Sequence, residues 1–293
     1  MTTTAYSERI SVPAPLPEAT DSGWYRIAGP ELPYAALAGE HTCDCVVVGA
    51  GWMGLHAARR YAELRPDARV VLVDATRIGN NASGRCMGFA IDLAHNPRQQ
   101  DFVEDLQGNF DELHVNTEGN AYLRSAVEEL GVECEWDPQG KFHCAATDHG
   151  KADLLEFSRA LDRMGQSYRW LEQSEIQDIT GSRHYVRALH QPGTILLQPA
   201  KYLRNASRLL PANVQVFENS PVRTVRYARD AAHHVLETDQ GVIRAHQVIL
   251  CTAAHLQHFG FHPASAIPIY TFASMTRVLT APELALMGSM NAY

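Results

Sequence analysis

The stretch CDCVVVGAGWMGLHAARRYAELRPDARVVLVDA, residues 43–75, decides the fold. It opens with an apolar run rich in β-branched residues, passes through three glycines and closes with a second apolar run. Continuous apolarity is typical of parallel strands that are covered on both faces. The stretch therefore predicts a buried strand, a glycine turn, a helix that ends at Pro66, and a second buried strand. We expect the sheet-facing stripe of the helix to comprise Met53, Ala57, Tyr61 and Leu64.

Gly49, Gly51 and Gly54 form a GxGxxG run between the first strand and the helix. In such a run the first glycine permits a sharp turn, the second lets the backbone approach a pyrophosphate, and the third lets the helix pack closely on the strand. The helix N-terminus offers N–H groups to the phosphates. Asp74 follows Gly54 by 20 positions, where an acidic side chain accepts hydrogen bonds from ribose hydroxyls and repels a 2′-phosphate. The run therefore predicts a site for NAD or FAD and disfavours NADP.

A second glycine-rich segment, NNASGRCMGF at residues 80–89, follows the second strand. After a plain nicotinamide-binding unit we would expect an ordinary helix there. The segment instead offers backbone N–H groups and the Ser83 hydroxyl to the same cofactor. Because FAD is long and needs a second cradle, this segment favours FAD over NAD.

Composition excludes several other classes of protein. The chain has 293 residues, of which 45% are apolar and 20% charged, and a net charge of −8, so it is an ordinary globular protein with no clustered positive charge for nucleic acid. No apolar run approaches the ~20 residues that span a bilayer, so no membrane span is expected. The N-terminus does not look like a secretory signal and the six scattered cysteines do not suggest a disulfide framework, so we expect reduced thiols and a cytoplasmic protein.

The remaining sequence predicts a discontinuous two-domain α/β protein. An extended N-terminal arm occupies residues 1–40. A Rossmann-like FAD-binding domain, a parallel sheet with a β-meander, comprises 41–131 and 199–260. A partial α+β substrate domain comprises 132–198 and 261–293. Within these domains we expect a helix from Pro199, a strand at Val214 to Phe217, and a strand around Ile269 to Leu279.

These segments together resemble the D-amino-acid-oxidase superfamily of FAD-dependent oxidoreductases, within it the gamma-glutamylputrescine oxidoreductase-like branch. VVVGAGWMGL and Asp74 match the first cradle, and NNASGRCMGF is similar to the branch's GASGRNGG-type loop. LLQPAKYLR is similar to NPAKLVRGL, and VILCTAA is similar to VVLATNA. Relatives continue for another hundred or more residues, so we expect this chain to lack the family's C-terminal part.

The resemblance implies roles for particular residues. Glycines of the first turn line the pyrophosphate, Asp74 holds the adenosine ribose, the second loop lies between pyrophosphate and flavin ring, and the backbone of Val222 contacts adenine. The implied cofactor-binding residues are Gly49, Gly51, Gly54, Asp74, Ala75, Asn81, Ala82, Ser83, Gly84, Arg85, Val222, Thr252 and Ala253. No catalytic residue is assigned. Tyr270 and Arg277 are candidate substrate contacts. No metal site is predicted, because Gly260 and Pro263 interrupt the helical spacing of His255, His258 and His262.

The implied function is oxidation of the C–N bond of a small-molecule amine or amino acid by hydride transfer to the flavin, followed by imine hydrolysis and reoxidation by oxygen or another acceptor. Two alternatives stay open at this point: an NAD-dependent dehydrogenase, and a truncated, non-catalytic flavin-binding protein. The substrate, the electron acceptor and the oligomeric state are not assigned.

Overall fold

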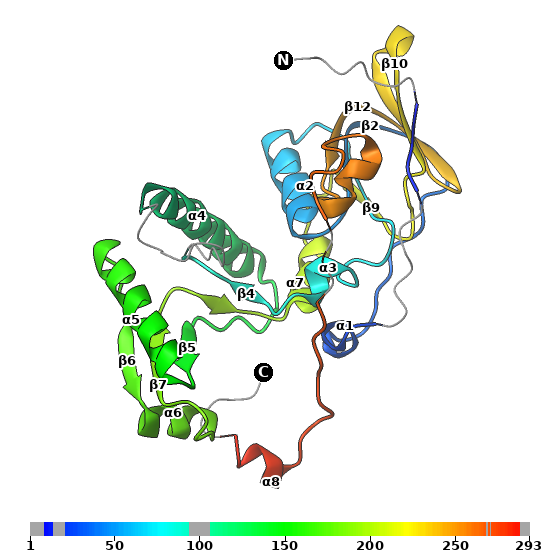
Figure 1. Cartoon of the computed structure of the whole chain (residues 1–293). Coiled ribbons are helices and arrows are strands. Elements are labelled where there is room, and N and C mark those ends of the chain that lie inside the picture. Colours follow the sequence, from blue (N-terminus) through cyan, green and yellow to red (C-terminus); the bar gives the residue numbers. More distant parts are fainter. Residues whose placement is uncertain (1–8, 14–20, 94–105, 268, 270, 288–293) are drawn as a thin grey trace. The chain divides into compact units, whose positions relative to one another are not determined.

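The computed structural model describes residues 9–13, 21–93, 106–267, 269 and 271–287 (Figure 1). The chain divides into two compact units. The first comprises residues 1–87, 132–134 and 198–273, and the second comprises residues 88–131, 135–197 and 274–293.

A seven-stranded sheet organises the first unit, in the order β1-β10-β11-β12-β2-β3-β9. The strands β12, β2, β3 and β9 run parallel, and β1, β10, β11 and β12 form an antiparallel extension. Their bounds are β1 Ile10–Ser11, β2 Gly39–Val48, β3 Val70–Val73, β9 Val214–Phe217, β10 Thr224–Ala228, β11 His233–Glu237 and β12 Gly241–Leu250. The prediction of a parallel sheet with a meander is confirmed, and β12 joins the last meander segment and the returning strand into one.

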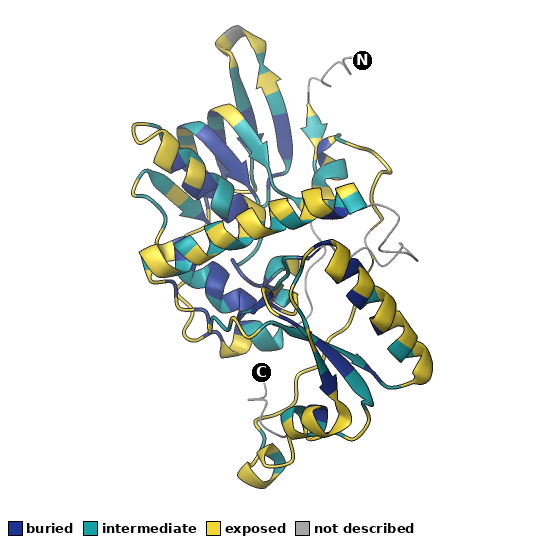
Figure 2. Cartoon of the chain, turned by 90° about the vertical axis from the view of Figure 1, so that its left-hand side faces the viewer, coloured by how far each residue is buried: buried dark blue, intermediate teal, exposed yellow. Residues whose placement is uncertain are grey.

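The parallel strands form the core of this unit because their side chains are apolar on both faces. Every residue of β3 is buried, as are the last four residues of β2 (Figure 2). One apolar cluster joins these strands to the meander and to the short helix η2, Ala253–Phe259. Its buried members are Leu37, Cys43, Val46, Val48, Val71, Val73, Phe217, Val222, Val225, Leu236, Ile243, Ala245 and Phe259.

Helix α2, Trp52–Leu64, contacts β2 and β3. Its buried face carries Leu55, Ala58 and Ala62. The predicted stripe was wrong, because Met53 is 75% exposed and Leu64 is 60% exposed. The close packing of the helix at Gly54 turns the face with Leu55, Ala58 and Ala62 toward the sheet, so Met53 and Leu64 lie on the opposite side.

The N-terminal arm packs on α7, Pro199–Arg208, which begins at the predicted proline. Helix α1, Gly23–Ile27, lies in this arm, and its buried Tyr25 contacts Ala28 and Ala200. The guanidinium groups of Arg77 and Arg204 lie 4.7 and 4.9 Å from the centre of the Tyr25 ring. The Tyr25 side chain therefore fixes this part of the arm to the rest of the first unit.

The second unit contains a three-stranded antiparallel sheet, in the order β5-β7-β6. A separate pair joins β4 and β8. The element bounds are β4 Phe89–Ala90, α4 Leu106–Leu130, β5 Lys141–Ala145, α5 Asp148–Arg163, β6 Arg169–Glu172, α6 Gln173–Thr180, β7 Arg187–Gln191, β8 Ile195–Leu196 and α8 Ala281–Leu284.

Two features of the structure differ from the sequence-based expectation. Residues 88–131 group with the second unit rather than with the cofactor domain, because Leu113 of α4 packs against Leu161 and Leu189. The stretch around Ile269 to Leu279 is extended but is not a strand where it is described, since no neighbouring strand there supplies hydrogen bonds to its backbone.

Every helix in the described part of the chain is too short or too polar to cross a membrane.

His56 joins α2 to α7. Its Nε2 lies 3.1 Å from the hydroxyl oxygen of Tyr202, a fully buried residue whose ring stacks on Trp52 at 4.9 Å. Burial, assisted by the charge of Arg59, lowers the pKa of His56 from 6.5 to about 4. The imidazole is therefore neutral near pH 7 and accepts the Tyr202 proton when its own proton is on Nδ1.

This burial predicts a specific loss of stability in acid. Between about pH 6.5 and about pH 4 the unfolded chain binds a proton at His56 while the folded chain does not, so the free energy of unfolding falls as pH falls, by at most about 3 kcal/mol. His56→Gln should flatten this part of the pH profile in urea unfolding. His149→Gln, at a side chain that is 91% exposed, is the control and should keep the wild-type slope. Equal slopes for His56→Gln and wild type would contradict the assignment.

Candidate cofactor-binding site

The first glycine turn lies at the carboxyl end of β2 and packs against the end of β12. Gly49 has φ of 99°, a conformation that favours glycine, and a Cβ there would lie 2.5 Å from the Cys251 carbonyl oxygen. A Cβ on Gly54 would overlap the Gly49 carbonyl. Both glycines are therefore required by backbone contacts, and they set α2 tightly on the strand ends.

The second turn repeats this geometry at the carboxyl end of β3. Gly79 has φ of 82°, and a Cβ on Gly84, five positions later, would overlap the Gly79 carbonyl. The short helix α3, Ala82–Arg85, follows as α2 follows the first turn. Two strand–turn–helix units thus sit at neighbouring parallel strands, which end at the same edge of the sheet.

The two turns face each other and are bonded together. Trp52 donates its backbone N–H to Ser83 Oγ at 3.3 Å and its indole Nε1–H to the Ser83 carbonyl at 3.0 Å. A Cβ on Gly51 would lie 2.5 Å from the same Ser83 Oγ. The glycine therefore permits the close approach of the second loop to the N-terminus of α2.

Asp74 holds both turns from the end of β3. Its carboxylate accepts the Ala50 N–H at 2.7 Å through Oδ2 and the Thr76 N–H at 2.8 Å through Oδ1, which also accepts the Thr76 hydroxyl. Burial raises the pKa of Asp74, and these hydrogen bonds oppose the shift. A carboxylate has about four acceptor positions, so these three bonds leave capacity for a ribose hydroxyl.

The residues present fit a dinucleotide. The N-cap residue of α2 is Gly51, which has no side chain, and the N-cap residue of α3 is Asn81, whose side chain makes no capping hydrogen bond; of the α2 N–H groups, that of Trp52 is taken by Ser83 Oγ. Thr252, next to the first turn, has a buried Oγ1 without a hydrogen-bond partner, a group that a cofactor oxygen would satisfy. Ala253 has φ of 46°, so the backbone turns sharply after β12.

The other predicted residues occupy varied positions. Arg85 folds back on its own loop and donates to the Asn80 carbonyl at 2.7 Å. Ala75 lies in the chain between Asp74 and Thr76. The Val222 side chain lies in the apolar core. Arg277 pairs with Glu283 of α8 at 2.6 Å, and Tyr270 lies outside the described residues.

Within the described ranges, no three His, Cys, Asp or Glu side chains gather in a way that could hold a metal ion.

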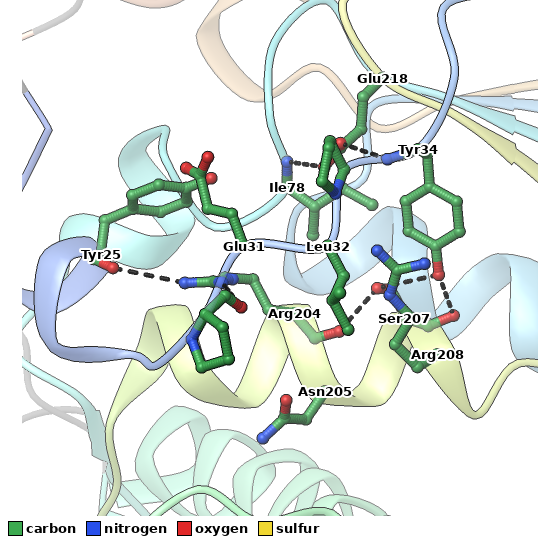
Figure 3. A pocket seen from close by; sticks show the side chains of 12 residues that line it. Tyr25, Glu31, Leu32, Tyr34, Ile78, Arg204, Asn205, Ser207, Arg208 and Glu218 are labelled. Atoms are coloured by element: carbon green, nitrogen blue, oxygen red, sulfur yellow. Dashed lines mark hydrogen bonds between the residues drawn. The ribbon is translucent and has the colours of Figure 1, made fainter.

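Sequence reasoning missed three residues that build the site: Trp52, Tyr202 and Glu218. Glu218 is 5% exposed and accepts the Ile78 N–H at 2.7 Å. One signal was available, since Glu218 directly follows β9 as Asp74 follows β3. A small hollow beside Glu218, lined by arm and α7 residues, includes none of the predicted cofactor residues (Figure 3).

A parallel sheet with two facing glycine turns and an acidic residue at the end of its second strand defines a dinucleotide-binding protein. Residues 44–290 match the model of the DAO family, described as FAD dependent oxidoreductase, and the chain belongs to this family.

The relatives are longer than this chain. It is 28% identical over 249 residues to a gamma-glutamylputrescine oxidoreductase of Escherichia coli, a match that covers 82% of this chain and 55% of that protein. Glycine oxidase from Geobacillus kaustophilus aligns with a TM-score of 0.62 at 21% identity, over 75% of this chain and 58% of the other. L-Amino acid deaminase from Proteus myxofaciens aligns with a TM-score of 0.57 at 18% identity, over 75% and 47%. The two structures share the fold, and the chain spans just over half the length of the E. coli relative.

The contact between the two turns predicts an unequal response to glycine substitution. Gly51→Ala should lower the free energy of unfolding by about 1–3 kcal/mol, because its Cβ meets Ser83 Oγ. In a Ser83→Ala background most of that cost should disappear, measured as a double-mutant cycle by urea unfolding.

Gly54→Ala is the matched comparison, because its Cβ meets backbone, so Ser83→Ala should not relieve its cost. Gly119→Ala lies in open space on α4 and should stabilise by about 1 kcal/mol. Additive behaviour of Gly51→Ala and Ser83→Ala would mean that the two turns do not meet.

Proposed function

We propose that this chain binds FAD across its two glycine turns and takes part in oxidising the C–N bond of a small-molecule amine or amino acid. The observation that carries the proposal is the bonded pair of turns, Trp52 to Ser83, at the carboxyl ends of two neighbouring parallel strands. One turn alone suits any dinucleotide, whereas two cradles side by side suit the longer FAD. The gamma-glutamylputrescine oxidoreductase similarity supports the amine substrate class.

In this proposal each element has a separate task. Gly49, Gly51 and Gly54 let the pyrophosphate approach the N-terminus of α2, where the helix dipole favours negative charge. Asp74 would hold the adenosine ribose, the loop from Asn81 to Arg85 would hold the part of the cofactor between pyrophosphate and ring, and the backbone at Val222 would contact adenine. The hydroxyl of Thr252 would donate to a cofactor oxygen.

Bound FAD supplies the hydride acceptor for C–N oxidation, and the protein supplies position and electrostatics. The resulting imine is hydrolysed in water, and oxygen or another acceptor takes up the electrons. We leave the catalytic residues unassigned, and Tyr270 and Arg277 stay candidate substrate contacts. The cytoplasm stays the proposed compartment.

An NAD-dependent dehydrogenase and a non-catalytic flavin-binding protein are the competing functions. The purified chain distinguishes them through its visible spectrum, recorded before and after anaerobic addition of putrescine derivatives and amino acids. We expect a yellow protein that bleaches. Stable yellow colour would support a binder without this activity, and a colourless protein that accepts NAD but not FAD would contradict the proposal.

Asp74→Asn should raise the Kd for FAD by about 10- to 100-fold. The variant keeps the size of the side chain but loses the charge, and its amide NH₂ must face the N–H of Ala50 or Thr76, which are both donors. Titration of the apoprotein with FAD, followed by flavin fluorescence, measures the effect.

Asp44→Asn is the control for this substitution. Asp44 accepts the Arg69 N–H at 2.7 Å at the opposite end of the same pair of strands, so its loss should leave the Kd for FAD within about 2-fold of wild type. If both variants bind FAD equally well, Asp74 does not hold the ribose.

A further inference from the structure

Glu218 is the buried carboxylate that follows β9, the outermost of the four parallel strands. We propose that Glu218 is a positioning residue, which fixes the second glycine loop in the place where it cradles the cofactor. The inference rests on the proposed function, because it assigns a role toward the same FAD site.

Each carboxylate oxygen of Glu218 accepts one backbone N–H from a different segment. Oε1 accepts from Ile78 at 2.7 Å, and Oε2 accepts from Tyr34 at 2.9 Å (Figure 3). The carboxylate thus bridges the loop after β3 and the N-terminal arm, which are separated by more than 40 positions in the sequence. Arg77 also joins the two segments, because its guanidinium donates to the carboxylates of Glu31 and Asp21 in the arm, but Glu218 is the group that accepts a backbone N–H from each of them.

The Ile78 contact lies midway along the second loop. Asp74 holds the start of the loop at Thr76, and Glu218 holds Ile78 just before the turn at Gly79. The Ile78 side chain is 2% exposed, so this point of the loop is enclosed. Two carboxylates therefore fix the path of the chain into α3 and determine where Ser83 meets Trp52.

The Tyr34 side of the bridge is itself anchored. The Tyr34 hydroxyl donates to the Ser207 carbonyl at 2.9 Å, and the Arg208 guanidinium lies 3.8 Å from the centre of its ring. Leu37 N–H donates to Ser220 Oγ at 2.8 Å, two residues after Glu218. The arm is thus fixed to α7 and to the β9 end, and it places the Tyr34 N–H as a stationary donor.

A carboxylate is the side chain that this arrangement requires. Glutamine has the same shape but only one acceptor oxygen, so its NH₂ must face either the Ile78 or the Tyr34 N–H. Ile78 and Glu218 are both buried, so an Ile78 N–H that faces the amide NH₂ loses its acceptor inside the protein, and an unpaired buried donor is costly. Aspartate keeps the charge but is one methylene shorter, so it can reach one donor but not both.

The first test needs no cofactor. In the full-length apoprotein, hydrogen–deuterium exchange of peptides covering residues 74–85 and 30–37 should be at least about 10-fold faster in Glu218→Gln than in wild type, while peptides from β2 exchange as before. Unchanged protection in both segments would overturn the inference, whatever the chain binds.

The second test measures the site. Glu218→Gln should raise the Kd for FAD by at least about 10-fold, and at saturating FAD it should change the visible circular dichroism of the bound flavin. An unchanged circular dichroism spectrum would mean that the hydrogen bonds of Glu218 matter only for stability, and it would overturn the inference. Glu218→Asp should recover part of the affinity. Glu40→Gln, at an exposed residue paired with Arg244, is the matched control and should bind FAD like wild type.

The outcomes separate the inference from the proposed function. A wild-type chain that binds no FAD defeats the proposed function, while the exchange measurement still decides whether Glu218 fixes the loop. FAD binding that is equal in wild type and Glu218→Gln overturns the inference and leaves the proposed function intact. If Glu218→Gln does not fold, Glu218→Asp carries both measurements, with partial losses in the same two segments.

Discussion

The loops that follow the parallel strands have backbone N–H groups inside the protein that need hydrogen-bond acceptors. Two buried carboxylates are the acceptors for several of them. Asp74 accepts from Ala50 and Thr76, while Glu218 accepts from Ile78 and Tyr34. Burying a carboxylate is costly unless its oxygens are hydrogen-bonded, so neither side chain is stable there without these amides, and the amides are unsatisfied without the carboxylates. This mutual dependence fixes the glycine turns, and the site depends on the turns.

Local sequence was sufficient for the parts of the fold that rest on local constraints. The strand–turn–helix–strand unit, the helix from Pro199 and the strand at Val214 to Phe217 all appear as predicted, because each follows from short apolar runs, glycine or proline. The face of α2 could not be read in the same way. Hydrophobicity alone favours Met53 and Leu64, whereas the helix turns the face that carries Gly54, Leu55 and Ala58 toward the sheet.

The site could be predicted only where all the residues of a motif lie in one short segment of the sequence. The glycines and Asp74 lie in a single stretch with a known spacing, but their contacts join distant segments. Trp52 meets Ser83 across 31 positions, and Tyr34 meets Glu218 across 184. A single sequence does not contain that pairing, so Glu218 reads as one more acidic residue after a strand. The same limit explains the stretch containing Phe272 and Val278, which are 96% and 93% exposed: its apolar pattern suits a strand, but a strand forms only where another lies beside it.

The two carboxylates also bear on how strongly a cofactor could bind. A loop that becomes ordered only on binding spends part of the interaction energy on its own conformational entropy, about 1–2 kcal/mol for each residue fixed. Here Thr76 and Ile78 are already held by Asp74 and Glu218, and Ser83 is already bonded to Trp52. The protein's own hydrogen bonds therefore hold the second loop, so little of the binding energy of the proposed complex would be needed to order it. These held segments lie at the carboxyl ends of β2 and β3, which is the edge of the sheet where we propose that FAD is held at two points.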